Sequence, residues 1–270
     1  MLENFVDIGP LTLSPFGIAM AGAFLFAYAI LRWGFQWLDV GDTEDASAIV
    51  LGAGLGGIAG AKIYYAILYS DWRLLFDRFG LVWYGGFIGG AGAVLWVIRR
   101  RRLVSWKAVD AATPALAIGY AIGRIGCFLV GDDYGMPTAL PWGVKFPFGL
   151  PGPTTAGFMR REYGAQVPFD VPAETLIPVH PTQLYETAAA LFIGVLGLMM
   201  VRRRVAAGTT SMVVLSLLAF ERFGVEFLRA KDDRMLGSIT LAQVLSLAVV
   251  AVLWFLWWRY RPAIDSRSDL

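Results

Sequence analysis

Charged side chains interrupt apolar stretches of this sequence, and their spacing is the first pointer to chemistry. Arg124 lies among small residues in the segment GRIGC. Arg222, Glu226 and Arg229 follow one another at i, i+4 and i+7, a spacing that predicts one shared helical face. The single carboxylate of Glu226 cannot neutralise three arginines, so the pattern predicts surplus positive charge that binds an anion. An internal ion-pair ladder is the alternative interpretation.

The residue types suggest both a ligand and a proton carrier. Guanidinium groups bind phosphate oxygens through paired hydrogen bonds and keep their charge when partly buried. In an apolar chain a phospholipid head group fits this chemistry best. The only histidine, His180, opens the segment HPTQLYE, which also carries Tyr185. A histidine pKa of about 6.5 suits proton transfer, but a histidine at a helix start more often caps the helix or forms a hydrogen bond, and both interpretations stay open.

The composition places the chain in a membrane. Hydrophobic residues make up 57% of the 270 residues and charged residues only 16%, whereas soluble domains carry about 25% charged residues. This excludes a soluble enzyme, a disordered regulator and a secreted disulfide scaffold. The net charge of +2 gives no indication of nucleic-acid binding, and the single cysteine, Cys127, cannot form a disulfide within the chain. The acidic start of the sequence predicts that no leader is cleaved.

Seven apolar stretches are long enough to cross a bilayer core of about 30 Å as helices. They lie at 11–33, 47–69, 81–98, 108–126, 182–201, 211–229 and 241–258. Basic residues near span ends mark the cytoplasmic side, and two clusters dominate, at residues 99–102 with Lys107 and at residues 202–204. The sequence therefore predicts an all-α integral membrane protein of about seven transmembrane helices, with its N-terminus outside and its C-terminus cytoplasmic.

The chain between Cys127 and His180 is too broken by prolines to span a membrane and too long for a simple turn. It predicts an external (periplasmic) subdomain at 127–180 between spans four and five. Helices one to four then occupy 1–126, and helices five to seven with a cytoplasmic tail occupy 181–270. Glycines crowd the second and third spans, and close helix packing is their plain interpretation. No internal repeat is visible in the sequence, which argues against an inverted-repeat transporter.

Five segments together resemble the prolipoprotein diacylglyceryl transferase family, seven-span bacterial inner-membrane enzymes with an outward N-terminus. They are YGGFIG from Tyr84, GRIGCFLVGDDYG from Gly123, HPTQLYE from His180, RFGVEFLR from Arg222 and QVLS from Gln243. Their order and spacing extend over nearly the whole chain. The resemblance implies transfer of the diacylglyceryl group of phosphatidylglycerol to the lipobox cysteine thiol of a preprolipoprotein, with release of glycerol phosphate.

Several positions depart from the family pattern. Cys127 stands where the family has Asn, Asp132 where it has Glu, and Tyr84 where it has His. The other departures are Ser14, Phe16, Lys62, Val130 and Leu218. The positions that match are Arg124, Arg222, Glu226, Arg229, His180 and Tyr185. The matching residues would bind the anionic donor, and the altered ones would serve the acceptor.

The resemblance and the residue chemistry together predict roles. Arg124 and Arg222 are expected to hold the head group and to stabilise the leaving phosphate. The remaining residues expected to line the substrate site are Glu226, Arg229, Gly85, Gly86, Cys127, Tyr185 and Lys62. The candidates for the thiol's proton acceptor are His180, Asp132 and Tyr84. Asp132 and the adjacent Asp133 have the plain alternative of solvated loop acids or arginine partners, and Cys127 is either a covalent way-station for lipid or, more plainly, a small buried side chain.

Three functions stay open at this point. The first is an active diacylglyceryl transferase of a divergent branch, and the second is a paralogue that uses the same donor with another acceptor. The third is a catalytically inactive membrane protein that binds phospholipid or lipoprotein. The expected partners are phosphatidylglycerol or a similar anionic phospholipid, the lipobox peptide and the bilayer of the bacterial inner (cytoplasmic) membrane. No metal ion or other cofactor is expected.

Overall fold

The structure is a computed structural model that describes residues 6–8, 11–76, 82–231, 234–236 and 239–265. Its helices are α1 (Pro15–Leu38), α2 (Thr43–Leu68), η1 (Trp72–Phe76), α3 (Trp83–Arg100), α4 (Ser105–Val130), α5 (Ala156–Tyr163), α6 (Thr182–Arg202), α7 (Thr209–Val225) and α8 (Leu241–Asp265). Its strands are β1 (Val6–Ile8), β2 (Leu11–Leu13), β3 (Arg234–Leu236) and β4 (Ile239–Thr240), and they form two small antiparallel pairs, β1 with β2 and β3 with β4.

Each predicted apolar stretch overlaps one long helix, namely α1, α2, α3, α4, α6, α7 or α8. Five of these helices, α1, α2, α4, α6 and α8, are long and apolar enough to cross a membrane. The other two, α3 with 18 residues and α7 with 17, are not among those five. The predicted class of a mainly helical membrane protein is confirmed, and the total of seven spans stays a prediction.

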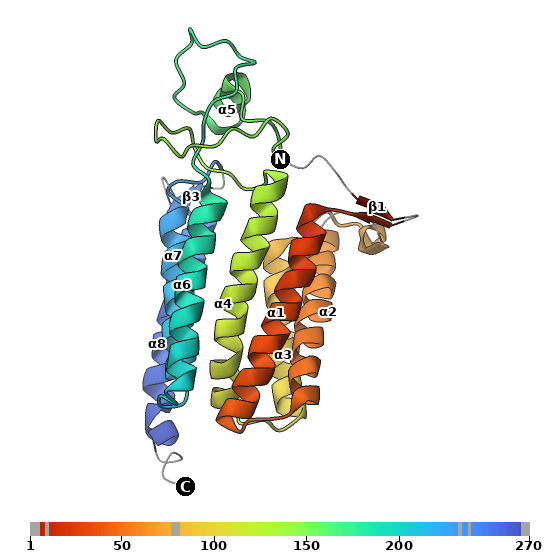
Figure 1. The fold of residues 1–270 in the computed structure, drawn as a ribbon, viewed down its shortest axis with the longest axis vertical. Helices are drawn as coiled ribbons and strands as arrows, with labels where there is room; N and C mark the ends of the chain where they lie inside the picture. The colour runs from red at the N-terminus through yellow and green to blue at the C-terminus, as the bar shows by residue number, and fades with distance from the viewer. Residues whose placement is uncertain (1–5, 9–10, 77–81, 232–233, 237–238, 266–270) are drawn as a thin grey trace.

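The α4 helix lies at the centre of the bundle (Figure 1). It packs on α1 on one side and on α6 and α7 on the other. The α2 and α3 helices pack on each other, and α8 packs on α7. The two groups of helices, α1–α3 and α6–α8, therefore meet chiefly through α4.

Large apolar side chains stay exposed along the bundle. Examples are Leu55 on α2, Phe192 on α6 and Trp258 on α8. Apolar surface of this extent is unfavourable in water and is expected where helices face lipid. The buried residues lie between the helices instead, as Leu31 and Phe35 do on the face of α1 that packs into the core. The chain is therefore built as a multi-pass membrane protein.

Glycines bring α2 and α3 into close contact. A Cβ atom added at Gly60 would lie 2.8 Å from Gly89 Cα, and one added at Gly56 would lie 2.6 Å from Gly89 O. A Cβ atom added at Gly85 would collide with the backbone carbonyl of Gly60. Larger residues at these positions would push the two helices apart. The predicted close packing of small residues in these spans is confirmed.

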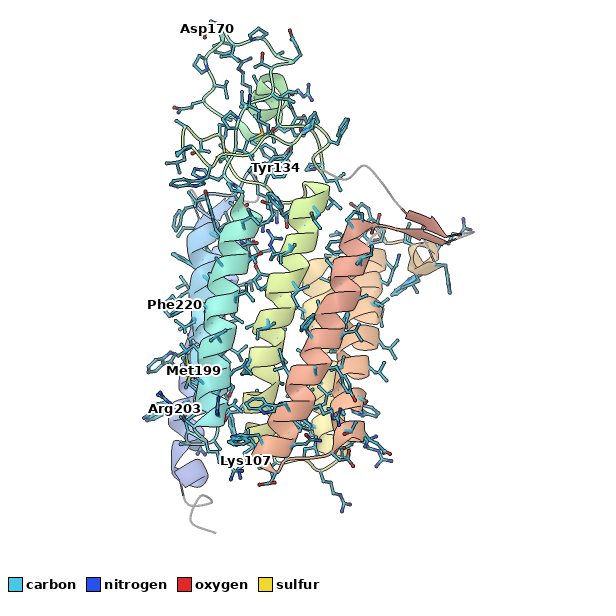
Figure 2. The ribbon with its side chains drawn as sticks, viewed as in Figure 1. Lys107, Tyr134, Asp170, Met199, Arg203 and Phe220 are labelled. Carbon is cyan, nitrogen blue, oxygen red and sulfur yellow. The ribbon has the colours of Figure 1, made fainter. Side chains whose placement is uncertain are left out.

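The two ends of the bundle carry different side chains. Lys107 and Arg203 lie at one end, and Tyr134 and Asp170 lie at the other (Figure 2). Lys107 and Arg203 belong to the two basic clusters that define the predicted cytoplasmic side. The clusters thus lie at one end of the molecule, as the predicted topology requires, while the orientation in a membrane stays a prediction.

The chain between α4 and α6 folds into an irregular subdomain beyond the helix ends (Figure 1). The α4 helix continues past the predicted end at residue 126 and stops at Gly131, whose φ of 71° breaks the helix. The subdomain has its own small core around Tyr134, Phe146, Met159 and Val179. This core fixes the start of the subdomain on the end of α4, next to the arginines described below.

Candidate active site

Two buried arginines share two carboxylates at the subdomain end of the bundle. Arg124, on α4, donates from Nη1 to Asp133 Oδ2 at 2.9 Å, and its Nε contacts Glu186 Oε2. Arg229 contacts the other oxygen of Asp133 and lies 3.5 Å from Glu186 Oε1 through its Nη1. Glu186, on α6, is 0% exposed and Arg124 is 6% exposed. Asp133 and Glu186 therefore bridge the two guanidinium groups across three segments of the chain.

A second ion pair extends this group along α7. Arg222 contacts Glu226 through Nη1, and Arg229 Nε lies 4.0 Å from Glu226 Oε2. The predicted shared helical face of Arg222 and Glu226 is thus confirmed, and their ion pair agrees with the alternative interpretation of an internal ion-pair ladder. The prediction that Arg229 shares their helical face is wrong, because α7 ends at Val225 and the chain then turns.

The turn after α7 is held by the loop that follows α4. Met136 donates its backbone N–H to Leu228 O at 2.8 Å, and Arg229 pairs with Gly135 in a short antiparallel bridge. A Cβ atom added at Gly135 would lie 2.6 Å from Leu228 O and 2.7 Å from His180 Cβ. Only glycine fits there. Gly135 therefore lets the loop after α4, the start of the HPTQLYE segment and the turn after α7 meet, and Arg229 lies next to Asp133 as a result.

The predicted surplus of positive charge is wrong for the structure as it stands. Arg124, Arg222 and Arg229 meet three carboxylates, those of Asp133, Glu186 and Glu226. The prediction counted only Glu226 and left out Asp133, which lies nine residues after Arg124, and Glu186 on α6. Both acids stand inside motifs that the sequence singled out, and this is the signal that could have identified them.

Arg124 keeps a guanidinium nitrogen available for a ligand. Arg124 Nη2 is buried and has no hydrogen-bond partner among the described residues. An unpaired charged donor is costly in a buried site unless a ligand or water accepts its hydrogen bond. The cluster of Arg124, Arg222, Arg229, Asp133, Glu186 and Glu226, called the arginine cluster below, therefore holds its cations in place and leaves an anion-binding donor open.

The two adjacent loop aspartates behave differently. Burial opposes the ionisation of Asp133, but Arg229 and Arg124 outweigh it and lower the pKa of this carboxyl below its ordinary value. Burial, together with the neighbouring Asp133, raises the pKa of Asp132. Asp133 is thus a fixed anion that positions arginines, whereas Asp132 holds a proton more readily.

Two hydrogen bonds join this aspartate loop to the start of α6. Thr182 donates from Oγ1 to Asp133 O at 2.8 Å, and Gln183 donates from Nε2 to Asp132 O at 2.6 Å. Both donors are fully buried. The HPTQLYE segment therefore contributes mainly through Thr182, Gln183 and Glu186, which connect α6 to the loop and to Arg124.

His180 belongs to a separate small network. Its Nδ1 lies 3.3 Å from the hydroxyl of Tyr185, which accepts a hydrogen bond from Trp142 Nε1 at 2.7 Å. Burial lowers the pKa of His180, and no charged neighbour contributes to this shift. His180 does not cap α6, whose N-cap residue, Pro181, has no side-chain hydrogen bond. The structure therefore brings His180 to the same end of the bundle but outside the arginine cluster.

The other predicted site residues lie in different surroundings. Cys127 is buried beside the arginine cluster, and Arg124 Nη1 donates to its Sγ at 3.5 Å. Gly85 packs on Gly60, while a Cβ atom at Gly86 would keep 3.4 Å from Gly57 O. Lys62 is half-buried on α2 and is not without an interaction partner. The side chain of Tyr84 lies outside the described part of the structure.

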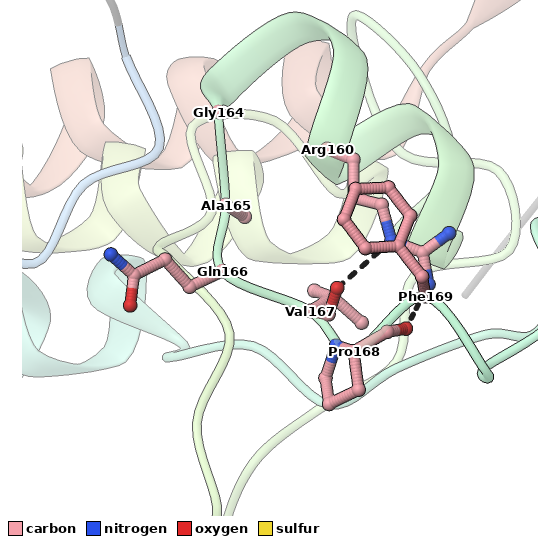
Figure 3. A pocket seen from close by; sticks show the side chains of 7 residues that line it. All are labelled: Arg160, Gly164, Ala165, Gln166, Val167, Pro168 and Phe169. Atoms are coloured by element: carbon pink, nitrogen blue, oxygen red, sulfur yellow. Dashed lines mark hydrogen bonds between the residues drawn. The ribbon is translucent and has the colours of Figure 1, made fainter.

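A surface depression on the subdomain is separate from the arginine cluster (Figure 3). Arg160 stands at its edge and donates from Nε to Val167 O at 3.0 Å and from Nη2 to Pro168 O. Its guanidinium also lies 5.4 Å from the centre of the Phe169 ring. These bonds use Arg160 to hold the loop in shape, so we assign this depression a structural role.

Comparison with known proteins places these motifs in one family. The family model described as prolipoprotein diacylglyceryl transferase matches residues 3–259. The chain belongs to the prolipoprotein diacylglyceryl transferase family. A relative from Trichormus variabilis, named phosphatidylglycerol--prolipoprotein diacylglyceryl transferase, is 31% identical over 281 residues, covering 98% of this chain and 93% of the relative. Relatives of the same name from Synechococcus elongatus and Pseudomonas fluorescens are 29% and 31% identical and cover 99% and 94% of this chain.

Membership of the diacylglyceryl transferase family confirms the resemblance drawn from the five sequence segments. The structure gives one of the altered positions a local role, because Ser14 Oγ accepts a hydrogen bond from Gly17 N at 2.9 Å and caps α1. Cys127 and Asp132 instead lie beside the arginine cluster. Ser14 therefore stabilises the start of α1, whereas Cys127 and Asp132 belong to the surroundings of the arginine cluster.

Proposed function

We propose that this protein transfers the diacylglyceryl group of phosphatidylglycerol to the lipobox cysteine thiol of preprolipoproteins and releases glycerol phosphate. The observation that carries the proposal is the buried Arg124, whose Nη2 is open to an anion within a pre-arranged group of cations. Family membership supports the choice of donor and acceptor. The reaction takes place at the subdomain end of the helices, where a lipid head group meets the site.

The arginine cluster suits the chemistry of the donor. When the acceptor sulfur attacks the glycerol carbon that bears the phosphate ester, a C–S bond forms and the C–O bond to phosphate breaks. Negative charge then gathers on the leaving phosphate. Arg124 and Arg222 stabilise this charge from fixed positions, which is the most effective way for charged donors to lower a barrier.

The carboxylates of the arginine cluster act as positioning residues. Asp133 and Glu186 each contact two arginines, so neither guanidinium group rotates away when no lipid is bound. Such preorganisation means that little energy is spent on ordering side chains during the reaction. The shared carboxylates also lower the local positive charge, so the site binds its anion and still releases the product.

The proposed function requires a particular membrane topology. We infer seven transmembrane helices in the bacterial inner membrane, with the basic clusters around Lys107 and Arg203 in the cytoplasm. Figure 2 places these two residues at the end opposite Tyr134, which lies in the subdomain. The arginine cluster then faces the outer leaflet, and the subdomain at 127–180 stands in the periplasm, where the acceptor peptide arrives.

A reconstituted transfer assay tests the function directly. Purified protein is mixed with phosphatidylglycerol vesicles and a lipobox peptide, and glycerol phosphate release is followed together with the mass of the peptide. Both signals together are expected. Release without a change in the peptide would indicate a paralogue with another acceptor. Neither signal, with lipid still bound, would contradict the transferase and indicate a lipid-binding protein.

A further inference from the structure

A fourth carboxylate lies beside the arginine cluster and is not needed to hold it. Glu221 precedes Arg222 on α7, one turn before the helix ends. An acid in a membrane-embedded helix is costly and marks a candidate for function. Glu221 lies outside the motifs that the family resemblance rests on, so the resemblance assigns it no role.

The surroundings of Glu221 are those of a site residue. Its carboxylate interacts electrostatically with Arg222 on its own helix, with Arg124 on α4, and with Arg229 in the turn after α7. Tyr120, one turn before Arg124 on α4, also interacts electrostatically with Glu221. Two of these four residues, Arg124 and Tyr120, come from α4, which packs on α7, so Glu221 lies toward the contact between α4 and α7.

Glu221 differs from its neighbours in having no ion pair with a described residue. Asp133, Glu186 and Glu226 each contact an arginine within 4.0 Å. Glu221 forms no such ion pair with a described residue, and its Oε2 is buried without a hydrogen-bond partner among the residues that the structure describes. A carboxylate tied to guanidinium is a poor proton acceptor, whereas one with a free oxygen is a good one.

We propose that Glu221 is a catalytic residue of this protein, the base that takes the proton of the acceptor thiol. The inference rests on the proposed function, because it needs a thiol to be presented beside the arginine cluster. His180, the residue with the most suitable ordinary pKa, lies outside that cluster in its own network with Tyr185. We assign the role of the base to Glu221 rather than to His180.

The step balances in atoms and charge. The thiol proton moves to the Glu221 carboxylate while sulfur forms its bond to the glycerol carbon of the lipid. The C–O bond breaks, and its electron pair leaves with the phosphate, which Arg124 and Arg222 hold. The proton on Glu221 then passes to the departing glycerol phosphate or to water, and this restores the carboxylate.

The test compares Glu221→Gln with the wild type in the lipobox transfer assay across a range of pH. Loss of a general base typically costs about 100-fold or more, so we expect a drop of that order near neutral pH. A thiol ionises by itself as the pH approaches its pKa of about 8.5. The deficit of Glu221→Gln should therefore shrink about tenfold for each pH unit toward that value, which a purely structural role would not produce.

Two control variants make the result decisive. Glu44→Gln makes the same change at an exposed acid at the start of α2, at the opposite end of the bundle, and should leave transfer unchanged at every pH. Glu221→Asp keeps the carboxylate and should restore part of the rate with the wild-type pH profile. If Glu221→Gln does not fold in detergent, Glu221→Asp carries the test, because its shorter reach should lower the rate without changing that profile.

The outcomes separate this inference from the proposed function. If the wild type transfers lipid and Glu221→Gln matches it, or shows the same deficit at every pH, Glu221 is not the base. Glu221→Asp could be the variant that folds when Glu221→Gln does not. The inference then also fails if the rate of Glu221→Asp equals that of the wild type, or if its pH profile differs from the wild-type profile. A wild type that shows no transfer to the thiol overturns the proposed function and this inference together.

Discussion

Arginines gather at both ends of this molecule, but in opposite surroundings. At the subdomain end, Arg124 and Arg229 are buried and share Asp133, on the loop after α4, and Glu186, on α6. At the other end, the basic clusters line short connections between helices, and Arg101 is among their exposed members. The same residue type is thus preorganised for binding at one end and solvated at the other.

The difference follows from where the carboxylates stand. A buried guanidinium must be paired and hydrogen-bonded, since an isolated buried charge costs far more than folding can offset. An exposed arginine is solvated by water, and its ion pairs contribute little. Burial with shared carboxylates therefore marks the functional end, whereas the number of arginines does not.

The largest effect is expected for Arg124→Ala. This change removes the open donor and one of the two cations that we propose hold the leaving phosphate, so transfer should fall by at least about 100-fold. The reconstituted assay measures the rate, and size-exclusion chromatography in detergent checks the fold. Arg124→Lys keeps the charge without the paired donors and should be intermediate. Full activity in folded Arg124→Ala would remove the phosphate role from this residue.

The next largest effect is expected for Glu186→Gln, mainly as a loss of folding stability. Glu186 is 0% exposed and contacts both Arg124 and Arg229, so neutralising it leaves two buried cations with fewer partners. Breaking a buried pair typically costs about 3–5 kcal/mol. A lower midpoint of thermal unfolding and slower transfer are both expected. An unchanged midpoint would mean that Glu186 is dispensable for holding the cluster.

Sequence patterns predicted most of the helices and the approximate place of the site. Apolar stretches gave the long helices, because a spanning helix needs little beyond length and hydrophobicity. Motif spacing brought Arg124, Arg222 and Glu226 to one end. The pairing of Arg229 with Asp133 was not predictable, since it depends on where α7 stops and on the close approach at Gly135. Tertiary contacts of this kind leave no periodic signal.

His180 shows the other limit of sequence reasoning. Its ordinary pKa made it an attractive base, but its contacts are with Tyr185. Glu221 was overlooked because it belongs to no quoted motif, and only the packing of α4 on α7 brings it toward Arg124. Residue type identifies what a side chain is able to do, and packing decides whether it lies where that chemistry is needed.

The two loop aspartates should respond oppositely to pH. The pKa of Asp133 is lowered by Arg229 and Arg124 against the effect of burial, so its stabilisation is present above the ordinary pKa of about 3.9 and is lost as the pH falls toward the lowered value. Asp133→Asn should therefore unfold more easily at neutral pH and lose less stability in acid. Thermal unfolding at a series of pH values measures both effects.

The neighbouring variant, Asp132→Asn, provides the contrast. Burial and Asp133 raise the pKa of Asp132, so its ionised form is disfavoured in the folded state, and it lowers stability at pH values above that raised pKa. Replacing it should preserve or increase the unfolding midpoint at neutral pH. Similar losses in both variants would show that the aspartates act alike, and the assigned roles would be wrong.

The smallest effect is expected at the basic end, for Arg101→Ala. Arg101 donates from Nη1 to Asp45 Oδ1 at 2.9 Å, but its side chain is 38% exposed. An exposed pair of this kind contributes at most about 1 kcal/mol and is screened by salt. The unfolding midpoint should shift slightly at low salt and hardly at all at high salt, with the transfer rate unchanged. A clear loss of transfer would mean that the two ends are coupled through α4, and the contrast between a binding end and a solvated end would no longer hold.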